Sequence, residues 1–192
     1  QNPPSRFVLA DFRSLESTGV NVFHPAVDTN HPDARRGALR WLQGWNHLLG
    51  AHPCLLKRVD SAADLEEIRR TGRAGVVLGL QNSTHFREVV DVALFHALGQ
   101  RVSQLTYNER NRLGSGCLAR PDRGLTTFGA AVVAEMNRLG MVVDVSHCGE
   151  RTTLDAFAAS TAPVLVTHAN CRALVPGQVR NKTDLEIRRM AA

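Results

Sequence analysis

Two stretches in the second half of the chain, VVDVSH at residues 142–147 and PVLVTHAN at residues 163–170, indicate the fold. Each is typical of a short β-branched strand that ends on a histidine. A strand of a buried parallel sheet is a continuous Val/Leu/Ile run, and functional groups in α/β proteins lie at the carboxyl ends of such strands. The two stretches therefore predict a parallel sheet whose histidines meet at one rim.

The alternation within each strand predicts where these histidines point. His147 is predicted to share a face with Val143 and Val145. His168 is predicted to share a face with Val164 and Val166. Two imidazoles at the same rim of one sheet are well placed to hold a metal ion. The alternative is that one or both are histidines at the edge of the core, bonded to the backbone.

The whole chain alternates strand patterns with helical patterns. The predicted strands are residues 20–27, 74–82, 101–108, 141–147 and 163–170. Helices are predicted at 33–50, from Ser61 to Gly72, from Arg87 to Gly99, from Thr126 to Gly140 and from Thr183 onward, with Ser61/Asp64 and Thr183/Glu186 as capping pairs. The stripe of Trp41, Trp45 and Leu48 on the first of these helices indicates core packing.

This alternation predicts right-handed β-α units in a single domain over residues 1–192. Two architectures fit the pattern: an open five-stranded doubly wound sheet, or about five of the eight units of a (β/α)₈ barrel. We expect the strands to lie parallel and in chain order, as a barrel requires. Periodicity alone does not choose between the two architectures.

Composition narrows the function classes. No apolar run approaches the roughly 18 residues of a membrane span, and QNPPSRF at the start is no signal region, which predicts a cytoplasmic protein. The net charge of +5 comes from arginine pairs in helical patterns, and with aromatics at 5% it does not indicate nucleic-acid binding. The four cysteines form no C-x-x-C pair; a mixed Cys/His zinc site is less favoured than buried thiols.

Much of the chain resembles one family, the membrane (renal) dipeptidases. The segments that carry the resemblance are GLQN at 79–82, QLTYNERN at 104–111, GLTTFGAAVVAEMNRLGMVVDVSH at 124–147, PVLVTHANCRAL at 163–174 and RNKTDLEIR at 180–188. The resemblance implies a (β/α)₈ barrel with a two-zinc centre that hydrolyses dipeptides. It also implies a divergent, bacterial-type subgroup and an incomplete chain.

The resemblance assigns roles to individual residues. His147 and His168 match the two histidines of the family's second zinc, and Arg180 matches an arginine that holds the substrate carboxylate, a task suited to a planar guanidinium. Gln81 stands in place of the glutamate that bridges the zincs, and Tyr107 in place of a histidine that contacts substrate. For Arg180 the alternative is a surface residue that caps nearby carbonyls.

Other family residues have no counterpart. The His-x-Asp of the first strand is missing, and the catalytic aspartate would fall beyond Ala192, so the catalytic residue stays unassigned. Glutamine cannot supply the bridging charge that two divalent ions require. We therefore expect at most one tightly bound zinc and weak or absent hydrolysis of small dipeptides.

Two other functions remain open. The chain could be a non-catalytic relative that binds a small peptide or carboxylate through Arg180 and Tyr107. It could also be a doubly wound domain with an unrelated small-molecule site, although no Gly-rich phosphate motif follows the first strand. If no further strands exist, unpaired sheet edges predict homo-oligomers.

Overall fold

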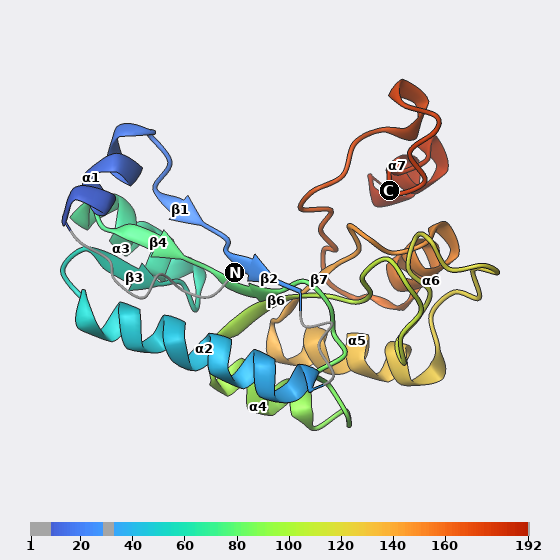
Figure 1. Ribbon diagram of the computed structural model, residues 1–192, viewed down its shortest axis with the longest axis horizontal. Helices are drawn as coiled ribbons and strands as arrows, with labels where there is room; N and C mark the ends of the chain where they lie inside the picture. The colour runs from blue at the N-terminus through green and yellow to red at the C-terminus, as the bar shows by residue number, and fades with distance from the viewer. Residues whose placement is uncertain (1–8, 29–32, 192) are drawn as a thin grey trace.

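Figure 1 shows a computed structural model, which describes residues 9–28 and 33–191. The strands are β1 (Val22–Phe23), β2 (Ala26–Val27), β3 (Leu56–Arg58), β4 (Ala74–Val76), β5 (Leu78–Leu80), β6 (Gln100–Gln104) and β7 (Val142–Asp144). The α-helices are α1 (Leu9–Ser17), α2 (Ala34–Ala51), α3 (Ala62–Thr71), α4 (Asp91–Ala97), α5 (Thr127–Leu139), α6 (Glu150–Ala159) and α7 (Asp184–Met190). Every pairing between these strands is parallel.

One hydrogen-bond ladder joins the first two predicted strands along their whole length. β1 pairs with β4 and β2 with β5, and the backbone bonds continue through the gaps: Val77 N donates to Phe23 O at 2.8 Å and Gly79 N to Pro25 O at 3.3 Å. Residues 20–27 and 74–82 therefore act as single strands, as predicted.

The strand order decides the architecture. The sheet runs β2-β5-β6-β7, and Leu165 forms a parallel bridge with Asp144 beyond β7. This is the order of the strands along the chain, with no reversal, so the doubly wound alternative is wrong. The predicted order of adjacent parallel strands is confirmed.

Some predicted elements are shorter than expected. In the stretch 163–170 only Leu165 pairs, donating to Val143 O at 2.8 Å and accepting from Val145 N at 3.0 Å, because no strand of the described residues lies on its other side. Helix α4 begins at Asp91 rather than at residue 87, since the Asp91 carboxylate accepts the backbone N–H of Arg87 and turns the chain there.

Three of the strands and α-helices were not predicted: β3, which pairs with β4, and the helices α1 and α6. Three residues are too few for a strand to show period-two alternation. The other helices begin and end close to their predicted positions. Ser61 and Thr183 form capping boxes, and Gly72 and Gly140 end their helices in the left-handed conformation at φ 70° and 74°.

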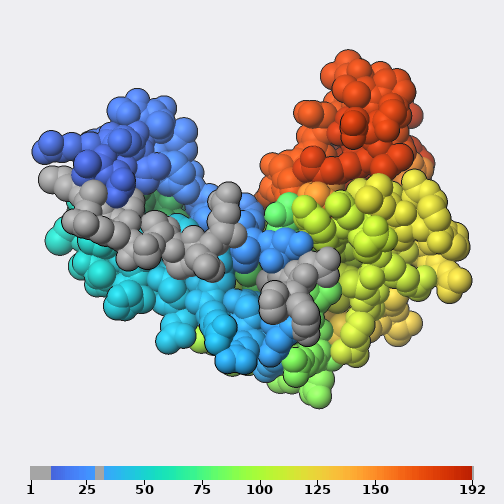
Figure 2. Space-filling model, in the orientation of Figure 1, coloured from blue at the N-terminus to red at the C-terminus, as the bar shows by residue number. Residues whose placement is uncertain are grey.

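The core lies between the sheet and the helices and includes Leu78, Leu80, Phe86, Phe95, Met136 and Val143, all at most 1% exposed. Trp41 and Leu48 are buried in it, as the stripe predicted, and Trp45 packs against it. Figure 2 shows the chain around α1 and the chain around α7 standing apart on one side of the molecule, with a hollow between them.

The predicted face of the histidines was wrong. Val143 lies opposite Ser103 in the sheet, and Ser103 lies opposite Leu80, so these three side chains share one face. Val143 and Leu80 belong to the core, so this is the face that packs on the helices. Gln81, the next residue after Leu80, lies on the opposite, inner face. Strand β7 ends at Asp144 and the chain turns at residues 146–147, which carries His147 away from the face of Val143. The valines before His168 also pack on the core, and His168 itself lies in a bend.

Candidate functional site

His147 and His168 converge on one amide. The Gln81 side-chain nitrogen lies 3.1 Å from His147 Nε2 and 2.7 Å from His168 Nε2. The two imidazole rings have their centroids 5.0 Å apart. The predicted meeting of the two histidines and Gln81 at one rim is therefore present in the structure, with an NH₂ group between the two nitrogens.

Neighbouring groups set the tautomer of both rings. His147 Nδ1 lies 2.7 Å from Asn108 Oδ1, which can only accept, so Nδ1 carries the proton. The Thr167 hydroxyl donates to Asp144 Oδ2 at 2.6 Å and therefore accepts from His168 Nδ1 at 2.7 Å. Both Nε2 atoms consequently present a lone pair to Gln81, which is the arrangement a metal ion would use.

The surroundings keep both imidazoles neutral. Burial, with the nearby charge of Arg180, lowers the pKa of His147 to about 4. Burial also lowers the pKa of His168, the charge of Asp144 opposes that shift, and Arg180 adds to it. Neutral imidazole is the form that binds a metal, so no proton has to leave these rings near pH 7.

Arg180 and Tyr107 complete the predicted group. Arg180 Nη2 donates to the backbone oxygen of His168 at 2.5 Å, while its Nε–H is buried without a hydrogen-bond partner among the described residues. The ring of Tyr107 stacks on His147, with centroids 4.3 Å apart and planes at 25°. The arginine therefore caps a carbonyl, as the alternative interpretation of Arg180 expected.

The sequence reasoning missed the residues that orient the histidines, Asn108 and the pair Asp144–Thr167. Asn108 directly follows Tyr107, and Asp144 and Thr167 lie within the two strand stretches, so their spacing could have drawn attention to them. Polar residues beside strand-end histidines commonly hold the second ring nitrogen.

The donor set is small for a metal centre. Over residues 9–28 and 33–191, no group of three or more His, Cys, Asp or Glu side chains could hold a metal ion. The mixed Cys/His site weighed from the sequence is absent there: Cys148 is fully enclosed, burial raises its pKa to about 11, and Cys171 lies exposed. What remains is two imidazoles and the Gln81 amide.

Comparison with known proteins identifies the family. The family model described as membrane dipeptidase, peptidase family M19, matches residues 14–192. The chain belongs to this family of metallopeptidases. A dipeptidase, tcpJ, of Claviceps purpurea is 30% identical over 169 residues, which cover 86% of this chain and 39% of that protein. An uncharacterized dipeptidase of Schizosaccharomyces pombe is 34% identical over 145 residues, 70% of this chain and 34% of the relative.

Solved structures agree on the fold. An amidohydrolase from Pseudomonas aeruginosa superimposes with a TM-score of 0.88 at 30% identity, covering 97% of this chain and 56% of that one. A metallo peptidase from Rhodobacter sphaeroides, liganded with a phosphinate mimic of the dipeptide L-Ala-D-Ala, superimposes at 0.82 and 21% identity, covering 94% and 61%. The fold is therefore of the (β/α)₈ barrel type, and the chain spans about a third to two fifths of the length of these curated dipeptidases.

The M19 family depends on metal, generally zinc, and the geometry here tests how well that fits. A two-zinc centre does not fit, because the position between the two Nε2 atoms holds an uncharged amide nitrogen instead of a bridging carboxylate. One ion held by the two imidazoles does fit the tautomers. No helix of the described residues is long and apolar enough to cross a membrane.

Asn108 offers a test of the tautomer argument. In Asn108→Ala, His147 Nδ1 loses its acceptor, so the ring should populate both tautomers and zinc affinity should fall about 10–100-fold. The ¹⁵N shifts of the His147 ring report the first effect and a zinc titration the second. Asn137→Ala, which removes an amide bonded to Ser160 far along the chain, should leave both unchanged. Unaltered His147 ring signals in Asn108→Ala would contradict the assignment.

Proposed function

We propose that this chain is a dipeptidase-type metallohydrolase whose site binds at most one zinc ion and hydrolyses dipeptides slowly or not at all. The observation that supports it most is the Gln81 NH₂ group, which donates toward both Nε2 atoms where the family has a carboxylate. His147 and His168 would hold the ion. Zinc, when bound, supplies Lewis-acid polarisation of a carbonyl and lowers the pKa of water.

Two residues of this chain would bind the substrate. Arg180 would hold the substrate carboxylate through its guanidinium, since guanidinium donors bind carboxylates in plane. Tyr107, stacked on His147, would form an apolar wall beside the substrate. Asp144, a carboxylate beside the histidines, already accepts from the hydroxyls of Ser146 and Thr167. A proton-shuttling acid is therefore not assigned.

A non-catalytic role stays as the second candidate, because a guanidinium such as that of Arg180, beside the Tyr107 ring, can bind a small peptide or carboxylate without a metal. Metal content and turnover distinguish the two.

The decisive experiment compares the parent, Gln81→Glu and His168→Ala, each with zinc supplied. We expect at most one equivalent of zinc in the parent, and less in His168→Ala. Gln81→Glu should bind zinc more tightly and raise dipeptide turnover by about 10²-fold, since one lost transition-state contact typically costs that much. Gln178→Glu, on an exposed loop, controls for the added charge.

Two outcomes would overturn the proposal. Two zinc equivalents in the parent would show that the charge argument is wrong. Robust turnover by the parent, abolished in His168→Ala, would establish a working peptidase without the carboxylate. No zinc in any variant, with the parent still binding dipeptide, would favour the non-catalytic candidate.

A further inference from the structure

A third histidine, His24, stands on the inner face beside the site. It lies between β1 and β2, and its ring fills the space above Gly79: a Cβ added to Gly79 would meet His24 Nε2 at 2.0 Å and Cδ2 at 2.9 Å. Only a glycine at position 79 leaves room for this ring. Gly79 and Gln81 point to the same face of their strand, so His24 lies on the face that carries the Gln81 amide.

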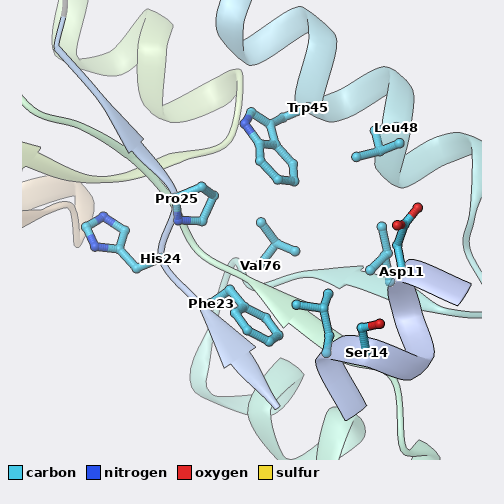
Figure 3. A pocket seen from close by; sticks show the side chains of 10 residues that line it. Asp11, Ser14, Phe23, His24, Pro25, Trp45, Leu48 and Val76 are labelled. Atoms are coloured by element: carbon cyan, nitrogen blue, oxygen red, sulfur yellow. The ribbon is translucent and has the colours of Figure 1, made fainter. Parts of the chain in front are cut away.

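His24 is one of the residues that line an apolar cavity. That cavity, of about 620 Å³, lies between α1, α2 and the sheet. Figure 3 shows the rings of Phe23 and Trp45 bordering it, whereas the His24 imidazole projects to the other side of the strand. The side chain is solvent-exposed and has no hydrogen bond to any described residue. Its ring nitrogens therefore have no protein partner among the described residues.

Two charged groups of the site, Asp144 and His168, act on the pKa of His24. Partial burial of the ring lowers its pKa, the carboxylate of Asp144 opposes that shift, and the charge of His168 adds to it. His24 thus approaches the site from the chain segment between β1 and β2.

We propose that His24 binds the amino end of a dipeptide whose carboxylate is held by Arg180. A ring nitrogen of neutral imidazole accepts a hydrogen bond from the ligand ammonium, and the nearby Asp144 carboxylate favours a positive charge at that place. This inference rests on the proposed function, because it assumes a dipeptide at the site. It makes the site selective for peptides with a free amino group.

Binding of two ligands tests the assignment: L-Ala-L-Ala and its N-acetyl derivative, titrated by calorimetry. His24→Ala should weaken binding of the free dipeptide about tenfold, the loss expected for one hydrogen bond to a charged group, and leave the acetylated ligand unchanged. His24→Gln keeps an acceptor and should restore most of the affinity. Gly79→Ala should act like His24→Ala, since its methyl group displaces the ring.

Controls separate this inference from the proposed function. His47→Ala, on the exposed side of α2, should change neither affinity, and thermal unfolding checks that each variant folds. If Arg180→Ala weakens both ligands but His24→Ala weakens neither, or weakens both equally, the role of His24 is wrong while the carboxylate site stands. If the parent binds no dipeptide, or Arg180→Ala has no effect, the proposed function fails with it.

Discussion

Replacing Lys182 with methionine is expected to lower the free energy of unfolding by about 3–5 kcal/mol, the cost of leaving a buried charge without its partner. The Lys182 and Glu186 side chains are 5% and 2% exposed, and their charged groups lie 3.1 Å apart. The Lys182 ammonium also donates to Cys148 O at 3.1 Å and to Thr153 Oγ1 at 2.8 Å. Methionine fills a similar volume but leaves the buried Glu186 carboxylate without its charged partner, with only the N–H and hydroxyl of Thr183 as donors.

This lysine also connects the two halves of the site. Cys148 directly follows His147, and Lys182 lies two residues after Arg180. Its ammonium therefore ties the turn that carries His147 to the loop that carries Arg180. We expect Lys182→Met to weaken carboxylate binding by Arg180 as well as stability.

Urea unfolding at pH 7 measures the effect. Lys57→Met is the matched control: its ammonium pairs with Asp64 and Glu67, but at a side-chain exposure of 28%, so its loss should cost less than about 1 kcal/mol. Lys182→Met combined with Glu186→Gln should recover part of the stability, because no buried charge then remains. A loss below about 1 kcal/mol for Lys182→Met alone would contradict this account.

Acid should destabilise the protein through His85. This imidazole is completely buried, packed against Phe86 and Phe95 with ring centroids 4.0 Å and 4.5 Å away. Burial lowers its pKa from 6.5 to about 4, although the Gln100 side chain and the Asn82 carbonyl oppose that shift. Between these two values the unfolded chain binds the proton and the folded chain does not.

The free energy of unfolding therefore falls as the pH is lowered. Stability from His85 is fully present above about pH 6.5 and is lost as the pH falls toward about 4, by about 3 kcal/mol for this difference in pKa. Comparing urea unfolding at pH 7.5 and pH 4 for the parent and for His85→Gln isolates this contribution, since glutamine does not titrate. Equal pH dependence in the parent and His85→Gln would show that His85 does not titrate in this way.

Local patterns in the sequence predicted much of this molecule. Helix ends were predictable because capping is decided within a few residues, as at Ser61 and Thr183. The parallel strands were predictable because a strand buried on both faces must be apolar throughout. The motifs around His147, His168 and Arg180 predicted which residues would meet at the rim, and the family.

Tertiary structure alone decided how those residues face one another. Alternation placed His147 on the face of Val143, but β7 ends at Asp144 and the turn after it carries the ring to Gln81. The position of His24 above Gly79 depends on the pairing of strands about fifty residues apart, which no local pattern encodes. A sequence determines periodicity and caps because these act over a few residues. Contacts between distant segments decide the tautomers of His147 and His168, the place of the Gln81 amide between them and the place of His24. These contacts exist only once the sheet has formed.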